Sequence, residues 1–124
     1  MYLYDVSFKA EKIIRKCLKV IEGLNLPISN SIRFIEIKGS DNYGSCVYNG
    51  TKSFCEYTVG INKYIINEKD YEDTVIHELI HTINGCNKTH NNIWNKYAED
   101  VRRRTNYSLF ANCYKELELG AYLI

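Results

Sequence analysis

The stretch from Thr74 to Thr82, TVIHELIHT, constrains the fold more strongly than any other part of the chain. It contains the pattern His-Glu-x-x-His inside an apolar run, and the whole chain has only 3 histidines. An α-helix turns about 100° per residue, so His77 and His81 lie about 40° apart on one face. The opposite arc is apolar and comprises Val75, Ile76, Leu79, Ile80 and Ile83. The spacing predicts a helix that packs by this arc and presents two imidazoles to a cleft.

Two imidazoles beside a carboxylate are a typical donor set for hydrolytic zinc chemistry. A zinc ion held by neutral imidazoles keeps one coordination position for water, and it lowers the pKa of that water towards about 7. Glu78 lies about 100° from His77 on the helix, beside the two ligands. From there it can take a proton from the water and later donate it to a leaving amine. The pattern predicts one Zn2+ bound by His77 and His81, with Glu78 as the catalytic general base.

A third protein ligand is needed, because catalytic zinc sites commonly use three. One common arrangement has a histidine six residues after His81, but Asn87 occupies that position. The remaining candidates are His90 and an acid of the next helix, either Asp100 or Glu99. Periodicity favours His90, which lies within about 40° of each residue of the apolar stripe of that helix. The stripe is formed by Trp94, Tyr97 and Val101, and core packing is the role expected for Trp94.

The remaining elements are expected in the order helix, strands, helices. Helices are predicted over residues 5–22, about 69–84 and about 90–104, and strands over residues 31–38, 45–48 and 54–61. Gly23 is expected to end the first helix in a left-handed conformation, and Gly85 is expected to stop the second helix. Turn-forming stretches separate the strands, which favours a small antiparallel sheet and the α+β class. One face of the last strand is expected to carry Cys55, Tyr57, Val59 and Ile61.

Length and charge restrict the class of protein. A chain of 124 residues, 1–124, is expected to form a single domain. Its net charge of +1 gives no general sign of binding to nucleic acid or to a membrane surface. No run approaches the roughly 20 apolar residues that span a bilayer, and the charged N-terminal region does not look like a signal peptide. We therefore expect a cytoplasmic protein without a membrane partner, and the sequence indicates no oligomeric state.

The cysteines are odd in number, and none forms a C-x-x-C pair; they are Cys17, Cys46, Cys55, Cys86 and Cys113. Without an export signal, this pattern predicts reduced thiols in the cytosol. A bridge between Cys46 and Cys55 across a hairpin is the one pairing that the sequence suggests. Cys86 follows the histidine helix and is expected to be a small buried thiol rather than a metal contact.

The motif residues resemble the SprT-like zinc metalloprotease family, the Spartan-related zincin domain. The resemblance rests on His77, Glu78, His81, the third histidine His90 and the aromatic Trp94 four residues later. It covers residues 31–104, with YGSCVYNG and YTVGINKYII at the places of the family's upstream strands. It implies a zincin-like fold and hydrolysis of peptide bonds. A protein or peptide substrate would lie along an edge of the sheet as an added strand.

The chain departs from the family in two places. Many relatives have Gly-His-Gly around the third ligand, whereas this chain has Thr89-His90-Asn91. Many also carry a C-terminal zinc ribbon with paired C-x-x-C motifs, whereas only Cys113 stands in that region here. We therefore expect one zinc site and no C-terminal zinc ribbon. DNA targeting in the Spartan branch depends partly on segments outside the protease domain, so a DNA partner is only weakly indicated.

Three functional hypotheses follow from the sequence. The leading hypothesis is a zinc-dependent metallopeptidase in which His77, His81 and His90 bind the metal. The second is a zincin-like module that binds a protein or DNA-bound partner and has little or no proteolytic activity. The third is a nucleic-acid-binding domain that uses the basic run Arg102–Arg104. A solvated helix end is the expected role of this run, since cations favour the C-terminal end of a helix.

Overall fold

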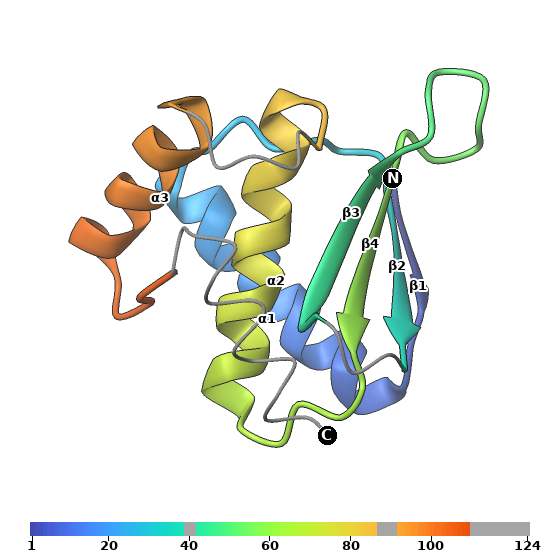
Figure 1. Cartoon of the computed structure of the whole chain (residues 1–124), viewed down its shortest axis with the longest axis horizontal. Coiled ribbons are helices and arrows are strands. Elements are labelled where there is room, and N and C mark those ends of the chain that lie inside the picture. Colours follow the sequence, from blue (N-terminus) through green and yellow to red (C-terminus); the bar gives the residue numbers. More distant parts are fainter. Residues whose placement is uncertain (39–41, 87–91, 110–124) are drawn as a thin grey trace.

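The computed structural model describes residues 1–38, 42–86 and 92–109. Three helices and a four-stranded sheet make up this part of the chain, which confirms the predicted α+β class (Figure 1). In chain order the elements are β1 (Tyr2–Asp5), α1 (Phe8–Leu24), β2 (Ile32–Ile37), β3 (Gly44–Tyr48), β4 (Tyr57–Asn62), α2 (Glu68–His81), the 3-10 turn η1 (Thr82–Asn84) and α3 (Asn92–Arg104).

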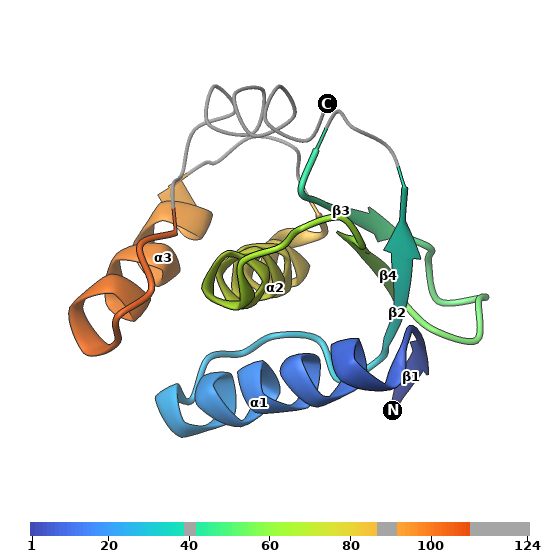
Figure 2. The same cartoon turned by 90° about the horizontal axis from the view of Figure 1, so that it is seen from below.

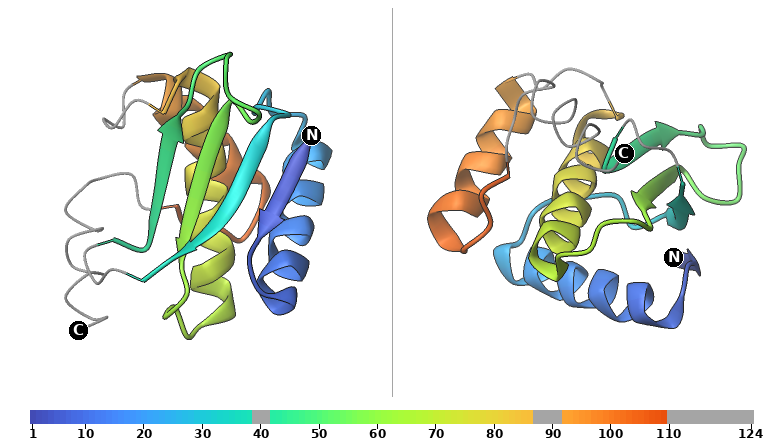
Figure 3. Two further views of the ribbon diagram at one scale, coloured as in Figure 1. Left: turned by 90° about the vertical axis from the view of Figure 1, so that its right-hand side faces the viewer. Right: turned by 60° about the horizontal axis from the view of Figure 1, so that its bottom comes forward.

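The sheet is mixed, so the expectation of an antiparallel sheet was wrong. Its strand order is β1-β2-β4-β3, and the left view of Figure 3 shows the four strands side by side with helices behind them. β1 is parallel to β2, β2 is parallel to β4, and only β3 is antiparallel to β4. Parallel neighbours need a crossover connection, and α1 provides it between β1 and β2. The sequence analysis missed β1 because Tyr2–Asp5 becomes a strand only by pairing with the distant residues 32–35.

The three helices lie on one face of the sheet, as Figure 2 shows. In that view α2 is central: it lies between the sheet and α3, and it also contacts α1. The helix is therefore buried on nearly every side from Tyr71 to Thr82. The apolar arc of α2 packs into the core as predicted, and Val75, Ile76, Leu79 and Ile80 are each 0% exposed. The histidine side of the helix is covered as well, which the sequence did not predict.

Local sequence signals set the helix ends. Ser7 caps α1 by accepting a hydrogen bond from the backbone N–H of Ala10. This helix does not end at Gly23 as predicted, because Asn25 takes the left-handed conformation with φ 60°. α2 begins after Asn67, whose side chain accepts a hydrogen bond from the N–H of Asp70. The helical segment of α2 and η1 stops at Gly85 as predicted, and Gly85 takes a left-handed conformation with φ 80°.

The predicted alternation in the last strand is confirmed on one face. Tyr57, Val59 and Ile61 are buried in the core, and Cys55 is buried just before β4 begins. Gly60 and Asn62 on the other face are also buried, since β4 lies inside the sheet with a neighbour on each side. This position makes β4 the strand through which β3 is attached to the rest of the sheet.

The basic run forms the last turn of α3 and makes ion pairs within its own helix. Arg102 lies 3.6 Å from Glu99, and Arg103 and Arg104 each lie 3.2 Å from Asp100. This arrangement agrees with a solvated helix end. Among the described helices, none combines the length and the apolar character that crossing a bilayer requires.

Candidate metal centre

His77, Glu78 and His81 form one compact group on α2. One potential ligand atom from each side chain lies within 4.8 Å of those of the other two, so the group could hold a metal ion. All three side chains are buried, with exposed fractions of 7%, 4% and 6%. The helical spacing therefore brings the predicted residues together. It does so inside the protein rather than on the wall of an open cleft, because α3 covers this side of α2.

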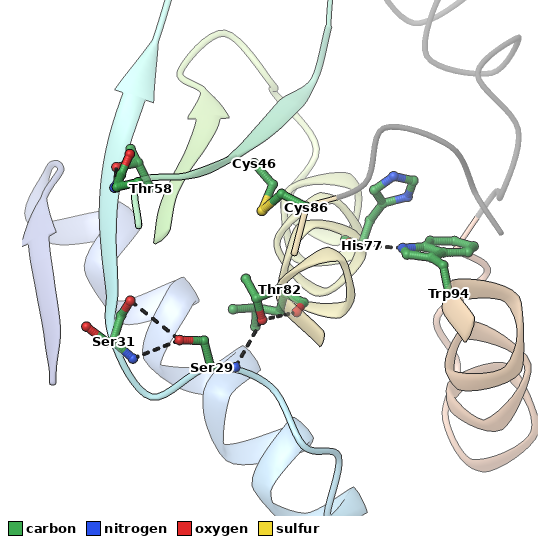
Figure 4. The surroundings of a disulfide bond; sticks show 10 residues. Ser29, Ser31, Cys46, Thr58, His77, Thr82, Cys86 and Trp94 are labelled. Carbon is green, nitrogen blue, oxygen red and sulfur yellow. Dashed lines mark hydrogen bonds between the residues drawn. A yellow bond between two sulfur atoms is a disulfide. The ribbon is translucent and has the colours of Figure 1, made fainter. Parts of the chain in front are cut away.

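Trp94 of α3 packs against both imidazoles. Its ring centroid lies 4.8 Å from that of His77 and 5.7 Å from that of His81. The indole N–H donates a hydrogen bond to the main-chain oxygen of His77 at 3.3 Å, drawn in Figure 4. Trp94 is 0% exposed, so the expected core role is confirmed. Its contact with both histidines was missed, although its place on the inward face of the last helix was a signal for it.

An acidic side chain lies one helical turn before His77. Asp73 accepts hydrogen bonds from the backbone N–H of Leu109 at 3.2 Å and from the Ser108 hydroxyl at 3.3 Å. Burial raises the pKa of the Asp73 carboxyl, and these two hydrogen bonds and the nearby His77 lower it in part. Asp73 thus joins the segment after α3 to the helix that carries the metal group.

The proposed third ligand lies outside the described residues, because His90 belongs to residues 87–91. Its role as a zinc ligand stays a prediction. The two acids considered as alternatives are described, and both make ion pairs near the C-terminal end of α3: Glu99 with Arg102, and Asp100 with Arg103 and Arg104.

A disulfide between Cys46 and Cys86 corrects the expectation of reduced thiols at these two positions. It joins β3 to the residue after Gly85, with the two Cα atoms 5.5 Å apart (Figure 4). The backbone N–H of Cys86 donates a hydrogen bond to the carbonyl of His81 at 2.8 Å. The suggested Cys46–Cys55 pairing was also wrong, since Cys55 is a free buried thiol, as is Cys17. The bonded cysteines are 40 residues apart in sequence, and only the packing of β3 near the end of α2 brings them together. Because disulfides are rare in the cytosol, the cysteines no longer support the expectation of a cytosolic location.

The described part of the chain is thus an α+β protein with a buried His-Glu-His group on its central helix. No family model matches the chain, and comparisons with curated proteins and with solved structures found no match. The functional argument therefore depends on the geometry of this site.

Proposed function

We propose that this protein is a zinc-dependent metallopeptidase. The observation that carries the proposal is the convergence of His77, Glu78 and His81, whose ligand atoms lie within 4.8 Å of one another. Neutral imidazoles suit zinc, and a neighbouring carboxylate is what a hydrolytic site requires as a base. His90 completes the proposed ligand set. When bound, the ion supplies Lewis-acid polarisation of a carbonyl group and a water of lowered pKa.

Each described residue of the site has its own proposed role. His77 and His81 would hold the ion through ring nitrogens one helical turn apart. Trp94 would keep the imidazoles oriented, because it packs on both rings and binds the main chain of His77. Glu78 would take the proton from the attacking water and transfer it to the leaving nitrogen of the peptide bond. Its burial, with 4% exposed, would keep bulk water from competing for that proton.

The edge of β3 is the proposed docking place for the substrate. In the described sheet β3 is an end strand, and it also contacts α2. Val47 and Tyr48 on this strand are 52% and 49% exposed. An extended peptide could add to this edge as a further strand, with main-chain hydrogen bonds providing affinity. The start of β3 lies against Glu78, which would bring a peptide bond of such a strand near the base.

The proposal is tested by metal content together with peptide cleavage. We expect the purified protein to bind about one zinc per chain and to cleave members of a peptide library. Glu78→Gln should retain the metal and lose about 10²-fold or more of the cleavage rate. Glu22→Gln, at an exposed acid of α1 that was never a candidate ligand, is the control and should cleave normally. Chelation should lower the melting temperature of the wild type, since bound metal stabilises only the folded state. A chain that holds no zinc after refolding with zinc would refute the proposal.

Burial of the group favours one alternative, a binding module in which the metal is structural. Structural zinc sites are closed, and here each of the three side chains is less than a tenth exposed. Under this alternative the wild type would have no cleavage activity for Glu78→Gln to lower. Zinc binding without cleavage by the wild type, on any peptide of the library, would favour the module.

A further inference from the structure

Gly44, the first residue of β3, lies directly against Glu78 of α2. A Cβ atom at this position would lie 2.8 Å from Oε2 and 2.9 Å from Cγ of Glu78. It would also lie 2.8 Å from the methyl carbon of Thr74. Side-chain atoms essentially never approach a Cβ this closely, so only a residue without a side chain fits between β3 and α2 here.

The backbone conformation of Gly44 gives no other reason for a glycine. The described glycines with positive φ are Gly50 and Gly85, and Gly44 is not among them. Any residue could therefore adopt the backbone of position 44 without strain. The contact with Glu78 and Thr74 is what excludes a side chain.

The backbone before β3 and the methyl group of Thr74 are both held in place at this contact. The buried Asn62 of β4 donates from its backbone N–H to the carbonyl of Tyr43 at 2.7 Å and from its side chain to the carbonyl of Asn42 at 3.0 Å. On the other side, the Thr74 hydroxyl donates to the carbonyl of Asp70 at 2.8 Å, which fixes its methyl group towards β3. The carboxylate of Glu78 stands at the far end of a flexible side chain, so it is the group that a Cβ atom at position 44 would displace.

We propose that Gly44 is a positioning residue for Glu78, an inference that rests on the proposed function. The bare backbone at the start of β3 forms a wall that confines the Glu78 carboxylate beside His77 and His81. A methyl group at position 44 would occupy the space of that carboxylate and displace it from the metal group. Because a catalytic group misplaced by about 1 Å can lose about 10²-fold in rate, this displacement should be visible in turnover.

The chain provides a matched control for the steric effect. A Cβ atom on Gly60 in β4 would lie 2.8 Å from Ile37 Cγ2 and from Ser45 Oγ, as close as the contacts at Gly44. These neighbours lie outside the metal group. Gly60→Ala therefore introduces a comparable clash into the same sheet without touching Glu78.

The test compares Gly44→Ala and Gly60→Ala in their metal-loaded forms. With Co2+ in place of zinc, we expect Gly44→Ala to bind the metal, to shift its visible absorption bands and to lower kcat by about 10²-fold with little change in KM. Gly60→Ala should match the wild type in the spectrum and in kcat. In a Glu78→Ala background, Gly44→Ala should leave the Co2+ spectrum unchanged, since the side chain it displaces is absent.

If Gly44→Ala fails to fold, the double variant with Gly44→Ala and Thr74→Ser takes its place in the test. This double variant removes the methyl contact and leaves only those with Glu78, and Thr74→Ser alone is its control. A wild-type spectrum and kcat in the folded position-44 variant would overturn the inference, as would equal changes in Gly60→Ala. A wild type that binds no metal refutes the proposed function and this inference together. A wild type that binds metal but cleaves nothing refutes only the peptidase, and the Co2+ spectrum still decides the role of Gly44.

Discussion

The indole N–H of Trp94 donates a hydrogen bond to the main-chain oxygen of His77 at 3.3 Å, which joins α3 to α2 at the metal group. The two rings also pack together, with centroids 4.8 Å apart. One side chain thus fills the core between two helices and fixes the environment of a proposed ligand. Because it is the only tryptophan of the chain, its fluorescence should report metal binding directly.

Replacing Trp94 should weaken both the fold and the metal site. Trp94→Phe removes the hydrogen bond and part of the packing on both imidazoles, and we expect the free energy of unfolding to fall by about 2 kcal/mol. The loss should be larger in the presence of zinc than in its absence, because the imidazoles become less well oriented. Urea denaturation followed by circular dichroism measures both values. Tyr97→Phe on the same helix is the control, and an equal loss with and without zinc would contradict a role for Trp94 at the metal site.

The bridge between Cys46 and Cys86 should contribute substantially to stability. It closes a loop with a sequence separation of 40 residues, and in the unfolded-chain entropy account a bridge across a loop of this size contributes about 4 kcal/mol. Cys46→Ser/Cys86→Ser should therefore unfold at a lower urea concentration than the wild type. A reducing agent should bring the wild type to the stability of the double variant and leave that variant unchanged. A wild type insensitive to reduction, or no cross-linked peptide in a non-reducing digest, would refute the bridge.

The buried thiol of Cys17 should make stability fall at alkaline pH. Burial, followed by the negative charge of Glu72, raises the pKa of Cys17 from 9.0 to about 12. Above pH 9.0 the thiol ionises in the unfolded chain but not in the folded one, so the free energy of unfolding decreases as the pH rises towards 12. The expected slope from this group is at most about 1.4 kcal/mol per pH unit.

Cys17→Ala should remove this part of the pH dependence. Its stability at neutral pH should be lower because of the lost packing, but its decline between neutral pH and pH 10 should be shallower than that of the wild type. Urea denaturation across this range measures the two slopes. Other groups that titrate there are common to both proteins, so parallel curves would show that Cys17 does not carry the effect.

The hydrogen bond from Tyr107 to the buried carboxylate of Glu72 should contribute more to stability than the one from the exposed Lys16. It accepts a close hydrogen bond from the hydroxyl of Tyr107 and a second one from Lys16 Nζ at 3.2 Å. Tyr107→Phe leaves the 4%-exposed Glu72 without the first of these, at an expected cost of about 2 kcal/mol. Lys16→Met should cost less, because the ammonium group is exposed and its ion pair is screened by solvent. Thermal unfolding of the two variants compares them, and a larger loss for Lys16→Met would reverse this ranking.

Features that lie within one segment of the chain could be predicted from its amino acids. The positions of His77, Glu78 and His81 on a helix follow from the 3.6-residue period. The buried face of β4 follows from strict alternation, and Gly85 acts as a helix-end signal within a few residues of chain. Each of these depends on local periodicity or on the conformational preference of a single residue, so it could be predicted without knowing what packs against it.

Contacts between distant segments became known from the three-dimensional packing alone. The parallel pairing of β1 with β2, the contact of Gly44 with Glu78, the packing of Trp94 on two histidines and the Cys46–Cys86 bridge all join residues far apart in sequence. No local pattern specifies such contacts, because they depend on how the sheet and three helices stack in space. The same stacking buries the histidines, since α2 became the central helix of the fold rather than one with a side facing an open cleft.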